Sequence, residues 1–275
     1  MSTRAGRYIS QLAGYRAFVP KPLAPDPPVR WDPDLVRLLS EADLALGRLD
    51  GLARSLPNPD LFVAMYVRRE AVLSSQIEWT QSSLDDLLAF EIDTPGMVQP
   101  VDLAETINYV KAMNTGIRLL AELPLSGRLI RGIHEELLAG VRGQERQPGQ
   151  FRTTQNWIGP ADCTIETATF IPPSPDDVPV AFGEMERFMH ERALPPLVHA
   201  GLTHAQFETI HPFLDCNGRV GRLLITLLLV ERGVLTRPLL YLSLFLKRNR
   251  AEYYDRLGAI RADGDWESWL RFFLR

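Results

Sequence analysis

The chain is poor in the features that mark secreted, membrane-spanning and nucleic-acid-binding proteins. It has two cysteines among 275 residues, Cys163 and Cys216, so no disulfide framework is expected and a cytoplasmic location is favoured. The longest apolar run, 223–230, contains Thr226 and is too short to cross a bilayer. Residues 1–20 lack the apolar core of a signal peptide. The net charge of −4 argues against a general binder of nucleic acids or anionic membranes.

The chain also lacks internal repeats and a phosphate loop of the Gly-x4-Gly-Lys type. Apolar residues instead recur at helical spacing over most of its length, which predicts an all-α fold. Strands are predicted at 163–171, as part of a short hairpin, and at 239–244, and an extended proline-rich arm is predicted at 20–28. Helices are predicted roughly at 33–56, 59–78, 82–92, 101–122, 127–142, 175–193, 196–210, 218–232 and 249–262, with a further helical start at Trp266.

The segment HPFLDCNGRVGR, from His211 to Arg222, gathers more chemically active groups than packing requires. Because His211 precedes a proline, a helix is expected to end there. Asn217-Gly218 predicts a tight turn with positive φ, and helical spacing resumes from about Arg219. A loop that leads into a helix amino end presents several unpaired N–H groups, so the segment predicts an anion site.

The side chains of this segment suit the handling of a polyphosphate. Arg219 and Arg222 are three residues apart and therefore share one helix face. Asp215 is the kind of ligand that Mg²⁺ prefers beside phosphates. His211 can accept a proton near neutral pH and so activate an attacking hydroxyl.

Two other site chemistries fit residues of the same region. His204, Glu208 and His211 are spaced by four and three residues, so one helix could offer them to a metal ion. Cys216 lies where a helix amino end would lower the pKa of a thiol, so Cys216 and His211 could form a nucleophile pair. A Cys216→Ala variant with intact activity would exclude the pair.

The pattern His-Pro-Phe-x-Asp-x-Asn-Gly-Arg-x-x-Arg resembles the signature of the Fic family, enzymes that mostly move AMP from ATP onto a hydroxyl side chain (Ser, Thr or Tyr) of a target protein. The resemblance implies a Fic-fold helical bundle with a short β-hairpin flap and an amino-terminal helical portion. It also implies that ATP is the co-substrate, that His211 is the general base and that Asp215 holds Mg²⁺. The implied nucleotide-binding positions are Phe213 as the anchor of the loop in the core, Cys216, Asn217, Gly218 and Gly221 in the phosphate loop, and Arg219 and Arg222 for the β- and γ-phosphates. Cys216 stands where the family usually has glycine, so a need for positive φ there would weaken ATP binding.

Two further segments resemble the same family. Residues 149–159 and 169–173 are similar to the flap, which implies that a target protein docks at about 163–171 by strand addition. Residues 240–244 and 249–254 are similar to the segment that flanks the adenine pocket. The implied adenine contacts are Asn249, Tyr253 and Tyr254.

The segment from Ser74 to Glu78 is similar to the family's inhibitory motif. There the glutamate pairs with the second arginine of the signature, here Arg222, and denies it to the γ-phosphate of ATP. The residue after the glutamate is Trp79, where the family has Gly or Asn. The resemblance further implies a boundary between an inhibitory helical region, 1–99, and a catalytic domain, 100–275. It also implies a homodimer and a chain that is truncated before a winged-helix module.

The resemblance leaves three functions open besides AMP transfer. A degenerate member would bind nucleotide as a regulatory protein with little turnover. Other members of the family move a different group, such as phosphate, UMP or phosphocholine, or remove AMP from its target.

Overall fold

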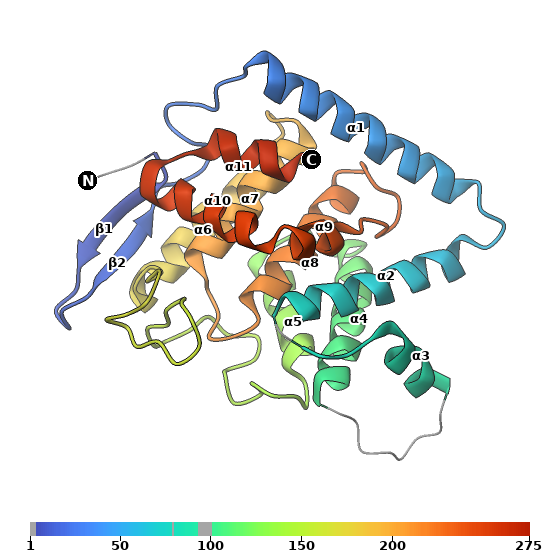
Figure 1. Cartoon of the computed structure of the whole chain (residues 1–275), viewed down its shortest axis with the longest axis horizontal. Coiled ribbons are helices and arrows are strands. Elements are labelled where there is room, and N and C mark those ends of the chain that lie inside the picture. Colours follow the sequence, from blue (N-terminus) through green and yellow to red (C-terminus); the bar gives the residue numbers. More distant parts are fainter. Residues whose placement is uncertain (1–3, 79, 93–100) are drawn as a thin grey trace. The chain divides into compact units, whose positions relative to one another are not determined.

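The computed structural model describes residues 4–78, 80–92 and 101–275, and most of them are helical (Figure 1). Trp79 and the predicted boundary at 99/100 lie outside the described residues. The helices are α1 (Pro33–Arg54), α2 (Pro59–Ile77), α3 (Leu84–Ile92), α4 (Val101–Leu120), α5 (Gly127–Leu138), α6 (Val178–Met189), α7 (Pro196–Ile210), α8 (Asn217–Glu231), α9 (Leu242–Arg248), α10 (Arg250–Asp263) and α11 (Trp266–Phe273), with a 3₁₀ turn, η1, at Pro175–Asp177. The predicted all-α fold is therefore confirmed.

The chain divides into two compact units, each built from separate stretches of sequence. The first comprises Met1–Ala42, Gln150–Asn217 and Glu252–Arg275, and the second comprises Asp43–Gly149 and Gly218–Ala251. The division falls inside the His211–Arg222 segment. Residues 211–217 therefore belong to the first unit and residues 218–222 to the second.

Helix α7 is the central element of the first unit. All of its residues from Leu197 to Ile210 are buried, so it lacks the polar stripe of a surface helix. A Cβ on Gly201 would lie 2.9 Å from a ring carbon of Phe273, and the Gly201 carbonyl accepts a hydrogen bond of 2.9 Å from the indole of Trp269. Helix α11 therefore packs closely on α7, and this packing fixes the helix that leads into His211.

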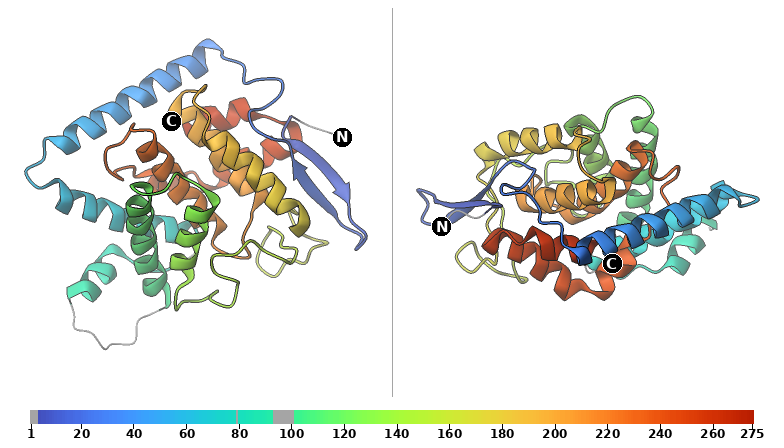
Figure 2. Two further views of the ribbon diagram at one scale, coloured as in Figure 1. Left: turned by 180° about the vertical axis from the view of Figure 1, so that it is seen from behind. Right: turned by 90° about the horizontal axis from the view of Figure 1, so that it is seen from above.

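A two-stranded antiparallel sheet belongs to the same unit. Strands β1 (Gly6–Ser10) and β2 (Arg16–Pro20) pair with Tyr8 opposite Phe18, and Figure 2 shows them as adjacent arrows. The N–H of Phe18 donates to the carbonyl of Ile171 at 2.9 Å. The hairpin thus packs on the flap segment near residue 171. Strands β1 and β2 were not predicted from the sequence.

Helix α8 forms the core of the second unit with α4 and α5. A Cβ on Gly116 of α4 would lie 3.0 Å from a methyl group of Leu227 on α8 and 3.4 Å from one of Ile133 on α5. The glycine lets the helices approach closely. Helix α2 packs against α4 and α9 in this unit.

Two strand predictions are wrong. Residues 163–169 form turns, and the flap contains an isolated antiparallel bridge, Ile158 with Phe170, instead of a strand over 163–171. The hydroxyl of Thr167 accepts from the N–H of Thr164, and the hydroxyl of Thr164 donates to Glu166. Such local bonds compete with a strand ladder. The segment 239–244 leads into α9, because the N–H and hydroxyl of Ser243 in its first turn donate to Glu70 on α2.

None of the described helices has the length and apolar character that a membrane-crossing segment needs.

Candidate active site

His211 sits at the carboxyl end of α7, in a strained turn. The helix ends at Ile210, as predicted, and His211 adopts the left-handed conformation with φ 49° and ψ 60°. Its N–H still donates to the carbonyl of Phe207 at 2.9 Å. A non-glycine residue in this region costs roughly 1–2 kcal/mol, so the surroundings must hold the turn in place.

Two buried arginines of the first unit hold this turn. Arg152, 2% exposed, donates Nε to the carbonyl of His211 at 2.9 Å and Nη2 to the carbonyl of Pro173 at 2.5 Å. Arg261 donates Nη2 to the carbonyl of Glu208 at 3.1 Å, and its guanidinium lies 3.9 Å from the ring centre of Phe170. The last turn of α7 is thus fastened to the flap from two sides.

Burial, together with these arginines, lowers the pKa of the histidine. Although part of His211 remains exposed, enclosure by the surrounding chain lowers its pKa to about 3, with help from the positive charges of Arg261 and Arg152. A hydrogen bond to the Glu208 backbone opposes the shift. The imidazole is therefore neutral at physiological pH.

The loop after His211 is closed by one amide side chain. Asn217 accepts the N–H of Phe213 at 2.9 Å through Oδ1 and returns Nδ2 to the carbonyl of Phe213 at 2.8 Å. Phe213 is fully buried, as expected for the anchor of the loop. The Nδ2 of Asn156, from the flap, donates to the same carbonyl at 2.8 Å. Because the side chain of Asn217 shapes the loop, an anion would meet its backbone N–H rather than its amide.

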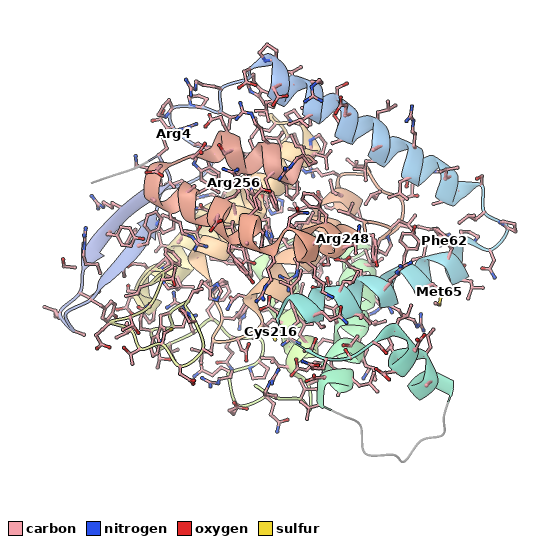
Figure 3. All side chains as sticks on the ribbon, in the orientation of Figure 1. Arg4, Phe62, Met65, Cys216, Arg248 and Arg256 are labelled. Carbon is pink, nitrogen blue, oxygen red and sulfur yellow. The ribbon has the colours of Figure 1, made fainter. Side chains whose placement is uncertain are left out.

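The left-handed residue of the loop is Cys216, not the predicted Asn217-Gly218. Cys216 has φ 58°, whereas Asn217 begins α8 and Gly218 lies in its first turn. The N–H of Cys216 donates to the carboxylate of Asp215 at 2.6 Å. The thiol-bearing residue, labelled in Figure 3, thus occupies a conformation that favours glycine.

In the second unit, Arg222 on α8 is held by the carboxyl end of α2. Its Nη2 lies 2.8 Å from Oε1 of Glu78 and 3.0 Å from the carbonyl of Ser74, and its Nε donates to the hydroxyl of Ser74 at 2.8 Å. The Arg222 side chain is 1% exposed and that of Glu78 is 36% exposed. A Cβ on Gly218 would overlap Oε1 of Glu78. Glycine at this position therefore makes room for the carboxylate.

Arg219 forms an ion pair with a different carboxylate, that of Glu105. Its Nη1 lies 3.1 Å from Oε2 of Glu105 on α4, and both side chains are buried. The other oxygen of Glu105 lies 3.1 Å from Nη2 of Arg142, whose side chain is 65% exposed. One carboxylate thus pairs with two guanidiniums. Gly221, the remaining predicted position of this stretch, is buried within α8.

A third carboxyl group lies in the same network. Glu70 of α2 is buried and accepts hydrogen bonds from the hydroxyl and the N–H of Ser243, at 2.5 and 3.1 Å. Burial raises its pKa to about 7, against the opposing effects of Ser243 and Arg222. Burial likewise raises the pKa of Tyr109 on α4, which also interacts with Glu70 and Ser74. Residues such as Glu70, Glu105 and Arg152 were missed in the sequence because they are single polar residues on otherwise ordinary elements.

The predicted adenine contacts fall into different environments. Asn249 caps the end of α9, with Nδ2 2.9 Å from the carbonyl of Phe245. Tyr253 is 1% exposed, and its hydroxyl is 2.8 Å from Nε2 of His204. Tyr254 is 42% exposed. Of the two tyrosines, Tyr254 offers the open ring surface.

The alternative metal site finds no support. Nε2 of His204 forms a hydrogen bond with the hydroxyl of Tyr253, and its ring stacks on Trp269 with ring centres 5.9 Å apart. Within the described ranges, no three His, Cys, Asp or Glu side chains form a group able to hold a metal ion. His204 is therefore part of a buried aromatic cluster.

Comparison with protein families assigns the chain. Residues 36–118 match the model described as Fic/DOC family N-terminal, and residues 124–229 match the model described as Fic/DOC family. The chain belongs to the Fic/DOC family. The second match contains the His211–Arg222 segment, and the first contains Ser74 and Glu78.

Individual relatives agree with this assignment. The chain is 30% identical over 197 residues to a probable protein adenylyltransferase of Aquifex aeolicus, a match that covers 71% of this chain and 55% of the relative. It is 30% identical over 199 residues to the protein adenylyltransferase Fic of Drosophila melanogaster, over 70% of this chain and 35% of the relative. A crystal structure of a Fic family protein from Desulfovibrio desulfuricans superimposes with a TM-score of 0.74 at 24% identity, over 90% of this chain and 72% of the other, which shows the shared fold.

Proposed function

We propose that the protein is an adenylyltransferase that transfers AMP from ATP to a hydroxyl side chain of a target protein. The observation that carries the proposal is the neutral, turn-held His211 that opens a segment with the complete set of residues for phosphate binding. The names of the relatives, protein adenylyltransferases in two distant organisms, support the same reaction.

His211 acts as the general base. In the proposed reaction the target hydroxyl gives its proton to the imidazole while its oxygen bonds to the α-phosphorus of ATP. The bond from that phosphorus to the bridging oxygen breaks, and pyrophosphate leaves. A pKa of about 3 keeps the imidazole unprotonated before the reaction.

The phosphate-binding residues fit ATP with Mg²⁺. Asp215 is partly exposed, and one carboxylate beside substrate phosphates is a common protein environment for Mg²⁺. The bound ion would offset charge on the phosphates. The N–H groups of the loop would hold the α-phosphate, and Arg219 and Arg222 the β- and γ-phosphates.

Glu78 restrains this activity. Its carboxylate bonds to Arg222 at 2.8 Å and fills the space above Gly218, which supports competition with the γ-phosphate for the same guanidinium. Ser74 steadies the arginine through its hydroxyl and its carbonyl. Release of Glu78 would give Arg222 to the nucleotide.

The target protein is proposed to dock on the flap, near residues 163–171. The Ile158–Phe170 bridge and the bonds of Arg152 and Asn156 to the His211 turn connect this flap to the catalytic base. A homodimer and a cytoplasmic location stay predictions.

Incubation with ATP and Mg²⁺ followed by intact mass spectrometry tests the proposal. Wild type, or better Glu78→Gly, should gain the mass of one AMP on itself or on a hydroxyl-bearing protein. His211→Ala should lose transfer by roughly 10²–10⁴-fold while it keeps ATP binding, because the base acts on the hydroxyl. Full transfer by His211→Ala would refute the assignment, and a different added mass would identify another transferred group.

The same assay tests two alternatives with two different variants, Cys216→Ala and Glu78→Gly. Intact transfer in Cys216→Ala would exclude the Cys216–His211 nucleophile pair. If Glu78→Gly binds ATP without transferring AMP, the protein is instead a regulatory nucleotide-binding protein. The left-handed backbone of Cys216, where the family usually has glycine, is the reason to test this alternative.

A further inference from the structure

Arg152 makes more bonds to the His211 turn than any packing role requires. Its Nε donates to the carbonyl of His211 at 2.9 Å, its Nη2 reaches the carbonyl of Ile210 at 3.4 Å, and its own N–H donates to the carbonyl of Pro212 at 2.9 Å. Three consecutive carbonyls around the histidine therefore point to one residue. The carbonyl of Ile210 is among those that a helix leaves unsatisfied where it ends, and the other two belong to the turn that follows.

The same guanidinium also holds the flap. Nη2 donates to the carbonyl of Pro173 at 2.5 Å, two residues after the Phe18–Ile171 bond that joins the flap to the β1–β2 hairpin. Arg152 itself lies four residues before Asn156, whose Nδ2 donates to the carbonyl of Phe213. The arginine thus connects the flap and the histidine within a single unit.

The electrostatic setting of Arg152 sets it apart from a structural ion pair. It is 2% exposed, and within the described part of the chain it has no ion pair and its Nη1 is buried without a hydrogen-bond partner. Burial lowers its pKa to about 10, which still leaves it charged near neutral pH. A buried cation without a carboxylate is costly unless its hydrogen bonds are all satisfied, so its retention beside the base calls for a function.

We propose that Arg152 is a positioning residue for His211, which holds the catalytic turn in its left-handed conformation and couples it to the flap. A target that displaces the flap would move the carbonyl of Pro173 and, through the rigid fork of Arg152, the carbonyl of His211. This inference rests on the proposed role of His211 as the base.

Two substitutions separate geometry from charge. Arg152→Lys keeps the positive charge but loses the planar fork, whereas Arg152→Gln loses both. Arg131 supplies a matched control: its Nε also donates to a backbone carbonyl, that of Gly149 at 2.6 Å, which lies where the flap begins and not in the His211 turn. Arg131→Gln therefore removes an arginine–carbonyl bond of the same kind without touching the turn.

In the transfer assay, Arg152→Lys should lower kcat by about tenfold or more while the KM for ATP stays unchanged, since misplacement of the base affects chemistry and not nucleotide binding. Arg131→Gln should change neither constant. Wild-type kcat in Arg152→Lys, or an equal loss in Arg131→Gln, would overturn the proposal.

Nuclear magnetic resonance of the nucleotide-free protein tests the proposal without any activity. The charged groups that act on His211 are Arg152 from the flap and Arg261 from α10, whereas Glu208, on its own helix, acts through a backbone hydrogen bond. Arg152→Gln should raise the midpoint of the His211 titration, because one of the two positive charges that lower it is removed, while Arg152→Lys should leave it nearly in place. In both variants the amide of His211, bonded to Phe207, should exchange at least about tenfold faster.

The two readouts keep the inference separate from the proposed function. An absence of transfer in wild type would count against AMP transfer, and the resonance data would still judge Arg152. Unchanged amide exchange and an unchanged His211 midpoint in a folded Arg152→Gln protein would contradict the positioning role. If Arg152→Gln does not fold, the exchange rate of the His211 amide in Arg152→Lys tests the positioning role, and an unchanged rate there would contradict it.

Discussion

In the first unit, Arg152 and Arg261 donate to backbone carbonyls around His211, whereas in the second unit Arg219 and Arg222 face the carboxylates of Glu105 and Glu78. Backbone carbonyls cannot be exchanged for a ligand, so the first arrangement suits a fixed base. Carboxylates occupy a guanidinium in the way that a phosphate would, so the second arrangement suits a site that a ligand can take over. The comparison separates arginines that hold backbone geometry from arginines whose carboxylate partner a phosphate could replace.

The largest expected effect concerns the buried pair of the second unit. Glu105→Ala leaves Arg219 buried without its carboxylate and should lower the free energy of unfolding by about 3–5 kcal/mol. Arg142→Ala removes the exposed partner of the same carboxylate and should cost less than about 1 kcal/mol. Urea denaturation of both variants measures the difference. Equal losses would show that burial of the partner does not decide the cost.

A second effect depends on pH. Burial raises the pKa of Glu70 to about 7, so the folded state holds this proton more tightly than the unfolded state does. The stability that the proton provides is complete below about pH 4.5 and is lost as the pH rises to about 7, by about 3 kcal/mol.

Glu70→Gln removes this titration while it keeps groups that can bond to Ser243. Relative to wild type, the variant should gain about 3 kcal/mol of unfolding free energy between low and high pH. Urea denaturation of both proteins at about pH 4.5 and pH 8 provides the measurement. A difference that stays constant with pH would mean that folding does not raise the pKa of Glu70.

The smallest effect concerns the strained loop. Cys216→Gly relieves a left-handed conformation and should raise the free energy of unfolding by up to about 1 kcal/mol, and it should hold or raise ATP affinity. Cys216→Ala removes the thiol but keeps the strain and serves as the control. Thermal unfolding and calorimetric ATP titration distinguish the two. An equal stability change in both variants would assign the effect to the thiol.

How far the sequence predicts this molecule depends on the range of the interactions. The helices follow from local apolar spacing, and the end of α7 follows from the proline after His211. Glu78 could be matched to Arg222 through the family resemblance, since both ends of that contact carry recognisable motifs. The structure places Glu78 on Arg222 as the resemblance implied, and it adds a bond from Arg222 to the hydroxyl of Ser74 that was not predicted.

The failures come from bonds that no local pattern reports. The threonines of the flap have high strand propensity, yet their hydroxyls close turns at 164–167. The β1–β2 hairpin was missed although alternating residues near Gly14 could have indicated it. Glu105 and Arg152 depend on partners 114 and 59 residues away, so only the folded chain identifies them.

Side-by-side transfer rates of wild type and Glu78→Gly test the central claim most directly. If Glu78 holds Arg222 away from the nucleotide, Glu78→Gly should transfer AMP at least about tenfold faster, which requires only about 1.4 kcal/mol of barrier. Arg222→Ala should abolish transfer in both backgrounds, because the nucleotide needs the arginine that Glu78 releases. Equal rates in wild type and Glu78→Gly would contradict the account, since Glu78 would then restrain nothing.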